Sequence, residues 1–141
     1  LQNGECRSNT GAGLRLADFD RDGRLDLVVC SSNVGHGVHM QSTGGLPLGR
    51  CRVTNTMCDN NGGDGVSLEA TTGGEVSRCT VTNNNGLGIS VFGNGHVVVS
   101  NTCTGNLGGP LFVPVPGNVV GPVIDEVTIG GNCNPAANYV Y

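Results

Sequence analysis

The chain has 141 residues, enough for one domain, and its 25 glycines and lack of tryptophan argue against a core built from bulky side chains. The formal charge is −4 with seven arginines as the cations, which excludes the basic surface of a nucleic-acid-binding protein. No apolar run is long enough to span a bilayer, and seven cysteines in so short a chain indicate an oxidising, extracellular environment. The chain begins with Leu1 rather than Met, so we expect a processed form or a piece of a longer protein.

The main feature of the sequence is a repeated pattern, Asn-x-Gly-x-Gly-apolar-x-apolar. Four intact copies, and a fifth with Pro110 in place of its second glycine, occupy residues 9–16, 33–40, 61–68, 84–91 and 106–113. The first apolar residues of successive copies are separated by 24, 28, 23 and 22 residues: Leu14, Val38, Val66, Ile89 and Leu111. Intervals of this length are typical of the coils of a solenoid.

Each copy joins a glycine-containing turn to two apolar residues one position apart, the pattern of a strand with one buried face. A second such pair follows the same interval: Gly4/Cys6, Val28/Cys30, Cys51/Val53, Cys79/Val81 and Asn101/Cys103. Stacking these strands in parallel, about 4.7–4.9 Å apart, predicts an all-β parallel β-helix of about five coils. We expect one domain over residues 1–141, with stacked coils over 1–116 and a closing segment over 117–141.

The first residue of each copy is an asparagine, and the five form one column: Asn9, Asn33, Asn61, Asn84 and Asn106. Stacked asparagine amides at a turn hydrogen-bond to one another and to the turn backbone. We therefore interpret this column as a structural ladder and assign it no ligand.

An acidic loop lies between the first and second strands of the first coil. Its sequence, 18–26, reads Asp-Phe-Asp-Arg-Asp-Gly-Arg-Leu-Asp and predicts a calcium site with these ligands: Asp18, Asp20, Asp22, the Arg24 carbonyl and Asp26. An EF-hand would need a glutamate where Val29 stands, and a strand-like run follows instead of a helix. The loop more closely resembles the calcium loops of integrin-like repeats. We expect calcium to stabilise the loop rather than to take part in catalysis.

The repeat resembles the right-handed parallel β-helix family related to pectate lyases. Two tail segments, 117–122 and 134–139, look like the closing segment of bacterial members of that family. Right-handed coiling is implied by this resemblance and by the general bias of parallel crossovers.

Gly35-His36-Gly37 is similar to the active-site triplet of polygalacturonases, which share the architecture. Its glycines fall in register with the other copies, and the paired aspartates and the Arg-Ile-Lys motif of those enzymes are absent from the neighbouring coils. The outward positions of the repeat strand are Arg15, His39, Ser67, Ser90 and Phe112, with Asp64 and Glu69 nearby. His39 and Glu69 are the candidate catalytic residues, although this set favours a non-catalytic protein over an enzyme.

The cysteines leave the disulfide pattern open. Cys6 and Cys30 are predicted to stack in adjacent coils, as are Cys51 and Cys79, at a separation that allows but does not require a bridge. Cys103 lies in a later coil, and Cys58 and Cys133 are predicted to lie outside the stacked columns. The odd number leaves at least one thiol unpaired or intermolecular.

The sequence therefore favours an extracellular, calcium-stabilised β-solenoid that serves as a structural, adhesive or self-assembling module. The first coil begins at once, at Gly4-Glu5-Cys6, so we expect either missing upstream coils or end-to-end self-association. The alternative is a carbohydrate-active enzyme or carbohydrate-binding module that uses the outward strand face. A polysaccharide is then the expected partner.

Overall fold

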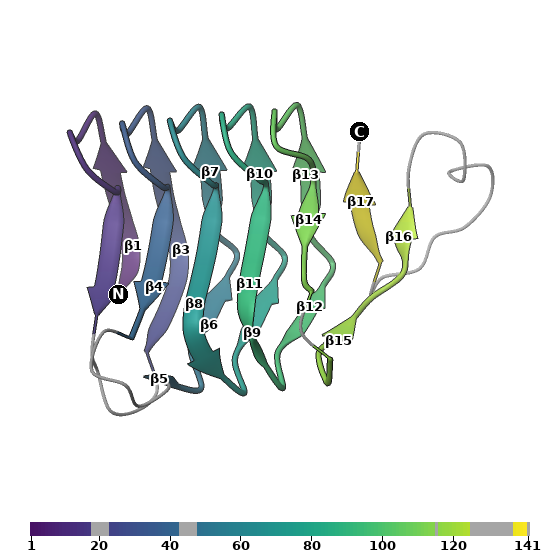
Figure 1. Ribbon diagram of the computed structural model, residues 1–141. Coiled ribbons are helices and arrows are strands. Elements are labelled where there is room, and N and C mark those ends of the chain that lie inside the picture. The colour runs from purple at the N-terminus through teal and green to yellow at the C-terminus, as the bar shows by residue number, and fades with distance from the viewer. Residues whose placement is uncertain (18–22, 43–47, 115, 125–136, 141) are drawn as a thin grey trace.

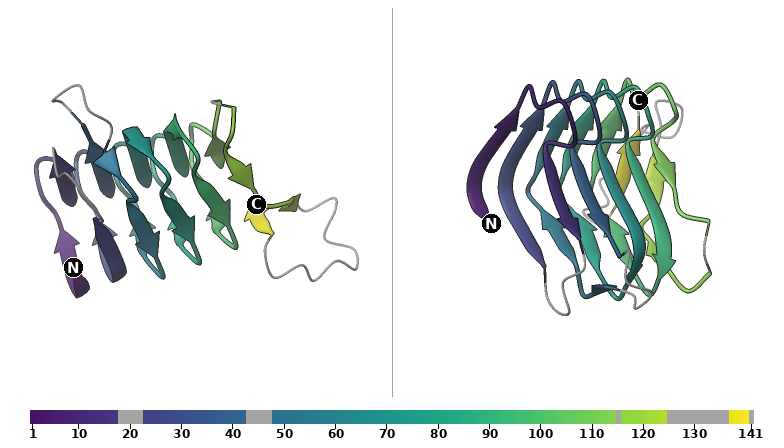
Figure 2. Two further views of the ribbon diagram at one scale, coloured as in Figure 1. Left: turned by 90° about the horizontal axis from the view of Figure 1, so that it is seen from below. Right: turned by 60° about the vertical axis from the view of Figure 1, so that its left-hand side comes forward.

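The computed structural model of the chain describes residues 1–17, 23–42, 48–114, 116–124 and 137–140. In these parts the chain forms β-strands that wind into successive coils stacked along one axis (Figure 1). Two further views show that the coils keep a common axis from the N-terminal end onward (Figure 2). The predicted parallel β-helix of about five coils is confirmed.

One sheet is built from the repeat strands. Its strands pair in the order β14-β11-β8-β4-β2, and their bounds are Leu14–Ala17 (β2), Val38–Gln41 (β4), Val66–Thr72 (β8), Ile89–Asn94 (β11) and Leu111–Phe112 (β14). A short strand, β5 (Leu48–Gly49), pairs with the end of β8. Every strand of the main path begins at its predicted first apolar residue, and these residues are partners in parallel register.

The second sheet covers the other side of the coils and bends along its length. Its strands are β1 (Gln2–Arg7), β3 (Arg24–Ser31), β6 (Arg52–Thr54), β7 (Met57–Asp59), β9 (Glu75–Ser77), β10 (Thr80–Thr82), β12 (Val97–Val99), β13 (Thr102–Thr104), β15 (Val119–Val120), β16 (Val123–Ile124) and β17 (Asn138–Val140). The first half of β3 pairs with β6 and its second half pairs with β7. Later coils therefore contribute two short strands each, one on either side of a corner.

The corner is a column of residues in the left-handed backbone region. Leu27 has a φ of 53° within β3, and the residues that follow it in register, Asn55, Arg78 and Ser100, have φ values of 51°, 53° and 59°. A single left-handed residue turns the strand direction sharply. Leu27 lies within the continuous strand β3, whereas in the next coils the corresponding left-handed residue separates two short strands, β6 from β7, β9 from β10 and β12 from β13.

The core consists of small apolar layers, as the composition predicts. Inward residues from successive coils stack on one another and are fully buried, among them Leu25, Val53, Val76 and Val98, then Met40, Leu68 and Val91. Each fully buried valine or leucine contributes about 1.5–3 kcal/mol from the area removed from water. Stacking of identical positions gives one continuous core along the axis.

The asparagine ladder is confirmed. Each side-chain amide donates to the Oδ1 of the asparagine one coil further on: Asn9 to Asn33 at 2.9 Å, Asn33 to Asn61 at 2.9 Å, Asn61 to Asn84 at 2.8 Å and Asn84 to Asn106 at 2.9 Å. The same amides of Asn33, Asn61 and Asn84 donate to a backbone carbonyl of the preceding coil. The ladder therefore satisfies buried turn backbone in coil after coil.

The predicted cysteine register is correct for the first coils and wrong for the third. Cys6 pairs with Cys30, and Cys58, which was predicted to lie outside the columns, pairs with Cys30 on the other side. Cys51 does not stack on Cys79, because the strand of Cys51 continues into β6, which aligns with β9 before the corner. In the third coil, apolar residues lie on both sides of the corner residue Asn55. The predicted alignment used the pair before Asn55, whereas the pairs of the other coils follow the corner.

Six cysteines are free thiols in the described chain: Cys6, Cys30, Cys51, Cys58, Cys79 and Cys103. Burial raises the pKa of Cys51 to about 11 and that of Cys103 to about 12. All of these thiols except that of Cys6, which is partly buried, are small buried side chains that fill the core. Cys133 lies outside the described residues.

The closing segment, where it is described, continues the stack. β15 pairs with β12, and β17 pairs with β13. Asn138 accepts the Asn101 side-chain amide at 3.0 Å, which repeats the ladder geometry at a second corner. Within the described residues, no helix is long and apolar enough to cross a membrane.

Candidate functional site

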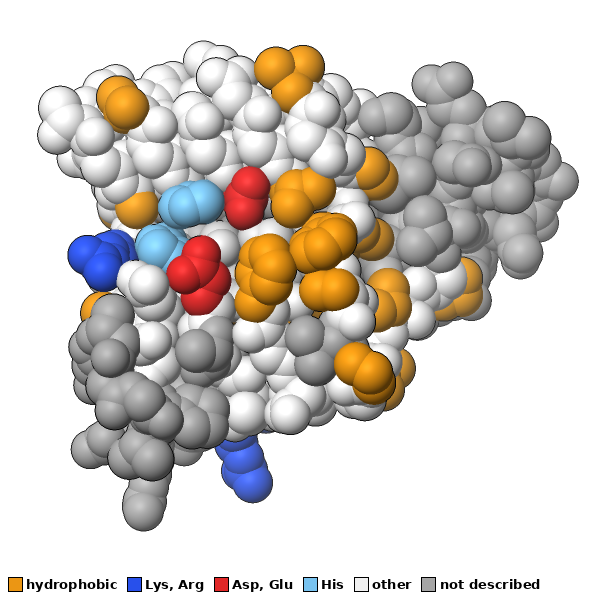
Figure 3. Space-filling view, viewed as in Figure 1, with side chains coloured by type: hydrophobic (Ala, Val, Ile, Leu, Met, Phe, Trp, Pro, Cys, Tyr) orange, Lys and Arg blue, Asp and Glu red, His pale blue; other side chains and the backbone are white. Residues whose placement is uncertain are grey.

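The outward face of the first sheet carries most of the chemistry that the sequence singles out. Its side chains, called here the outer strip, come from β2, β4, β8, β11 and β14: Arg15, His39, Gln41, Ser67, Glu69, Ser90, Phe92 and Phe112. Figure 3 shows a cation at one end of this face, histidines and carboxylates in the middle, and hydrophobic side chains beyond them. The strip therefore changes from polar to apolar along the solenoid axis.

His39 and Glu69, the predicted catalytic candidates, lie together on adjacent strands. His39 Nε2 is 3.4 Å from Glu69 Oε2, with 14% of the His39 side chain and 36% of the Glu69 side chain exposed. The register explains the contact, because His39 is the partner of Ser67 and Glu69 is two residues further along β8, on the same face. The prediction that these side chains share one face is confirmed.

His36 joins them from the turn before β4. The rings of His36 and His39 have centroids 4.7 Å apart, and one ligand atom from each of His36, His39 and Glu69 lies within 4.8 Å of the others. We call these three residues the His–Glu cluster. Sequence analysis considered His36 and the His39/Glu69 pair separately and did not combine them.

The glycines beside His36 are explained by packing between coils. A Cβ on Gly37 would lie 2.6 Å from the Gly65 carbonyl oxygen, and a Cβ on Gly63 would lie 2.9 Å from His36 Nδ1. Both distances are shorter than real Cβ contacts, so neither position accepts a side chain without displacing its neighbours. The glycines of the Gly-His-Gly triplet are therefore explained by the repeat, and His36 is the member of the triplet that the repeat does not explain.

Asp64 fixes the orientation of the His36 ring. The backbone N–H of Asp64 donates to His36 Nδ1 at 2.9 Å, which places the ring proton of the neutral imidazole on Nε2. The Asp64 carboxylate is held by the Leu87 N–H at 2.8 Å and the Ser90 hydroxyl at 2.7 Å, and it lies 3.8 Å from His36 Nδ1. Burial lowers the pKa of His36, against the opposing charge of Asp64.

Two polar atoms of the outer strip are buried without a hydrogen-bond partner among the described residues, His39 Nε2 and Ser67 Oγ. Ser67 is 1% exposed, so its hydroxyl is out of reach of a substrate and does not serve as a nucleophile. Asp64, the other carboxylate of the region, already accepts two hydrogen bonds. Among the described residues, the unpartnered buried polar atoms of the strip are therefore His39 Nε2, beside Glu69, and the inaccessible Ser67 Oγ.

Two aromatic rings extend the strip beyond the carboxylates. Phe92 and Phe112 lie on adjacent strands with ring centroids 5.4 Å apart, and they are 46% and 42% exposed. Aromatic side chains usually bury most of their surface, so two of them left open on a sheet face mark a surface for contact. Sequence analysis noted Phe112 as an outward residue but missed the pair, which the repeat register would have placed together.

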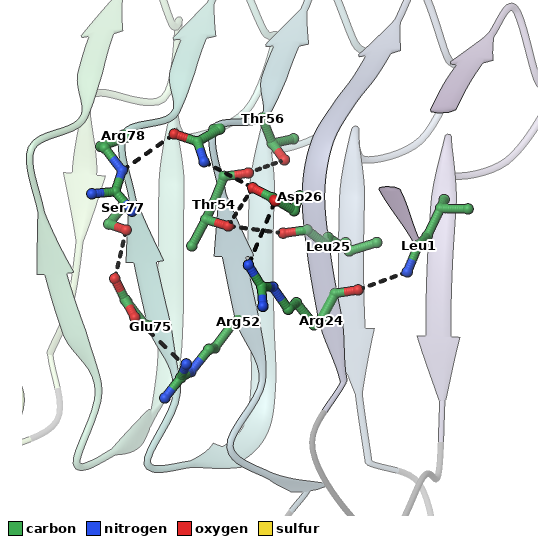
Figure 4. Close-up of polar contacts among 11 residues, drawn as sticks. Leu1, Arg24, Leu25, Asp26, Arg52, Thr54, Thr56, Glu75, Ser77 and Arg78 are labelled. Atoms are coloured by element: carbon green, nitrogen blue, oxygen red, sulfur yellow. Dashed lines mark hydrogen bonds and ion pairs between the residues drawn. The ribbon is translucent and has the colours of Figure 1, made fainter. Parts of the chain in front are cut away.

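Some of the predicted calcium ligands lie outside the described residues, and the others lie within them. Asp18, Asp20 and Asp22 lie outside the described residues, whereas Arg24 and Asp26 lie in β3. Asp26 Oδ1 accepts the Thr54 hydroxyl and the Asn55 amide, each at 2.8 Å, and the Arg24 guanidinium is 3.5 Å from Oδ2. Figure 4 shows Asp26 between Thr54 and Arg24. The hydrogen bonds from Asn55 and Thr54 lower the pKa of Asp26.

The Arg24 carbonyl also has a partner, since it accepts the backbone amine of Leu1 at 2.9 Å. The same network continues through Asn55, whose Oδ1 accepts Arg78 Nε at 3.2 Å. The Asp26 carboxylate therefore links β3 to β6 and to Asn55 at the corner, and Asn55 extends the network to the next coil. Sequence analysis gave Asp26 a metal-binding role and had no signal for its cross-strand partners, because Thr54 and Asn55 are 28 and 29 residues away.

Comparison with known proteins agrees with this architecture. A family model described as a right-handed β-helix region matches residues 28–132, which is more than half of the chain. No curated protein and no solved structure gives a significant match. The match confirms the resemblance to right-handed parallel β-helices and, with it, the right-handed coiling that the resemblance implies. The chain therefore belongs to the right-handed β-helix family.

Proposed function

We propose that the protein is a non-catalytic, extracellular adhesive module that binds an extended polysaccharide along its outer strip. The observation that carries the proposal is the exposed Phe92–Phe112 pair beside a row of polar side chains on the same sheet. A sugar ring has an apolar face that packs on an aromatic ring and a rim of hydroxyls that require hydrogen-bonding partners. The outer strip offers both kinds of group in sequence along one axis.

The shape of the strip supports an elongated ligand. Its strands are parallel and about 4.8 Å apart, so equivalent side chains recur at regular steps along the solenoid. At the polar end Arg15 donates to Gln41 at 2.9 Å, and Glu69 and His36 remain partly exposed in the middle. A polysaccharide chain lying along the axis would pack on the two phenylalanine rings and, further along the strip, contact the polar groups of the neighbouring coils.

The experiment is affinity electrophoresis of the chain in gels that contain neutral or acidic polysaccharides. Phe92→Ala and Phe112→Ala should each weaken binding about two- to tenfold, the range expected for loss of an aromatic contact of about 0.5–1.5 kcal/mol. Leu107→Ala is the matched control, because Leu107 is 79% exposed on a turn outside the strip. Unretarded migration in every gel would contradict the proposal, and shortening of the polymer would show an enzyme instead.

Calcium stabilisation remains part of the proposal, supported by the acidic loop that precedes β3. Because Asp26 is already bound by Thr54 and Asn55, we assign the metal-dependent part to Asp18, Asp20 and Asp22. Asp20→Asn should abolish a calcium-dependent rise in unfolding temperature. Asp26→Asn should lower the unfolding temperature equally with calcium and with a chelator, and a loss confined to the calcium sample would reverse this assignment.

End-to-end association is a second proposal, supported by the strand edges of the first coil. β1 pairs with β3 and β2 pairs with β4, and within the described residues neither has a partner on its other edge. Leu14, Leu16 and Cys6 are only partly buried there. Electron microscopy of the purified chain should show axial fibres that disappear in Leu16→Glu, whereas dispersed particles at high concentration would count against assembly.

A further inference from the structure

We propose that His36, His39 and Glu69 bind a divalent transition-metal ion of the zinc class. Two imidazoles and one carboxylate are the ligand types that zinc takes at sites with three protein ligands and one open position. Imidazole nitrogen does not suit calcium or magnesium, so this site is chemically distinct from the acidic loop before β3. The proposal does not depend on polysaccharide binding.

The spacing of the ligand atoms supports a metal. A tetrahedral zinc ion with bonds of about 2.0–2.2 Å holds its ligand atoms about 3.3–3.5 Å apart. His39 Nε2 and Glu69 Oε2 already lie 3.4 Å apart, and the ligand atoms of all three residues lie within 4.8 Å. Metal binding therefore requires the His36 ring, whose side chain is 30% exposed, to turn out of its hydrogen bond with the Asp64 N–H and toward the other two ligands.

The unpartnered state of His39 is the second observation. His39 Nε2 is buried and makes no hydrogen bond within the described chain, although a buried polar nitrogen without a partner lowers stability. Its contact with Glu69 lacks the geometry of a hydrogen bond. A metal ion between the two residues satisfies Nε2 and neutralises the carboxylate.

Asp64 completes the arrangement as a positioning residue. In the metal-free geometry His36 Nδ1 accepts the Asp64 backbone N–H, so the ring proton is on Nε2. Metal binding through Nε2 moves that proton to Nδ1, which ends the bond from the Asp64 N–H and requires the ring to turn toward the Asp64 carboxylate, 3.8 Å from Nδ1 in the metal-free geometry. Leu87 and Ser90 hold this carboxylate in place, as partners of metal-ligating histidines usually are held.

A simple ion pair between protonated His39 and Glu69 is the competing explanation. It needs no metal, and it predicts that the two side chains stabilise each other to the same extent in the presence and absence of zinc. It also leaves His36 without a role in the cluster, although its ring lies against His39. Metal binding by the full chain distinguishes the two explanations.

The test uses cobalt(II) as a spectroscopic probe and zinc as its competitor, with the reduced, chelator-treated full chain. Cobalt should bind with one ion per chain, give visible absorption without a thiolate charge-transfer band, and be displaced by zinc. His39→Gln, His36→Gln and Glu69→Gln should each weaken cobalt binding at least tenfold, and Asp64→Asn about 10–100-fold. Arg52→Gln, which removes an exposed cation of β6 on the second sheet, is the control and should bind cobalt as the unmodified chain does.

Three outcomes would overturn the proposal. A thiolate band would assign the metal to cysteines, unchanged affinity in Glu69→Gln and His39→Gln would place it elsewhere, and no binding at millimolar cobalt would leave only the ion pair. Circular dichroism of each metal-free variant verifies that it is folded. Glu69→Gln keeps the test decisive if a histidine variant fails to fold, because 36% of the Glu69 side chain is already exposed.

Discussion

The interior corners of the solenoid and its outer strip treat buried polar groups in opposite ways. At the corner of the fourth coil His96 is fully buried and both ring nitrogens are satisfied: Nδ1 accepts the Gly74 N–H at 3.1 Å, and Nε2 lies 3.1 Å from the Thr71 carbonyl oxygen. On the outer strip His39 Nε2 and Ser67 Oγ are buried with no hydrogen-bond partner among the described residues. A histidine at the corner therefore has hydrogen-bond partners for both ring nitrogens, whereas a histidine on the outer strip has a buried ring nitrogen with none among the described residues.

The difference separates architecture from function. The asparagine ladder and His96 satisfy turn backbone that every coil of a solenoid must bury, so their hydrogen bonds recur with the repeat. Within the described residues the His–Glu cluster occurs once, and its unpartnered His39 Nε2 costs stability without serving the fold. Polar groups that lower stability and do not recur with the repeat are the ones expected to bind a ligand.

The largest expected loss of stability comes from the asparagine ladder, and it tests the distinction between groups that hold the fold and groups that bind a ligand. Asn61→Ala removes an amide that donates to Cys30 and Asn84 and an oxygen that accepts from Asn33, leaving several buried groups unsatisfied. At about 1–3 kcal/mol for each such group, the free energy of unfolding should fall by about 3 kcal/mol or more. Urea unfolding monitored by circular dichroism measures the change.

Asn9→Ala is the matched control at the exposed end of the same ladder. Asn9 donates through its side chain to Asn33 alone, and its backbone N–H keeps a bond to the same oxygen. The loss should stay below about 1 kcal/mol. Equal losses in the two variants would mean that the buried ladder is not what holds the coils together.

His96 predicts an intermediate, pH-dependent effect. Burial lowers the pKa of His96 below its ordinary value of 6.5, so between the two values the unfolded chain binds more protons than the folded chain. The contribution is complete above pH 6.5 and is lost as the pH falls, with a slope of at most about 1.4 kcal/mol per pH unit.

The measurement is the urea midpoint of the chain and of His96→Gln from about pH 7.5 to about pH 5. Subtraction of the two profiles cancels the other histidines. The variant should be less stable at neutral pH and should lose less on acidification. Parallel profiles would show that His96 is not held neutral by its burial.

The fold was predictable because its signal is local and repeated. The first apolar residues of the five copies set the register of one whole sheet, and the asparagines set the ladder. The second sheet was less predictable because its corner is a left-handed residue of varied type, from Leu27 to Asn55 and Arg78. With no fixed residue to mark that corner, Cys51 was predicted on the wrong side of it and Cys58 was left outside the columns.

The candidate site was predictable only in part, for a related reason. The register placed His39 and Glu69 on one face, but the ring contact of His36 with His39 depends on side-chain rotamers that no repeat records. The missing hydrogen bond of Ser67 is likewise a property of its surroundings. Asp26 shows the converse, since a residue type typical of metal loops is engaged by Thr54 and Asn55.

Ser67 and Ser90 give the smallest and most direct test of the comparison. They are register partners on adjacent strands and both are buried, but the Ser90 hydroxyl donates to Asp64 at 2.7 Å while the Ser67 hydroxyl has no partner among the described residues. Ser90→Ala should lower the free energy of unfolding by about 1.5–3 kcal/mol, since its bond is to a charged group. Ser67→Ala should leave that free energy unchanged or raise it by up to about 1 kcal/mol, because it removes an unsatisfied buried oxygen at little cost in volume. A loss of more than about 1 kcal/mol in Ser67→Ala would mean that the hydroxyl is satisfied in solution, and the outer strip would then be as complete as the corners.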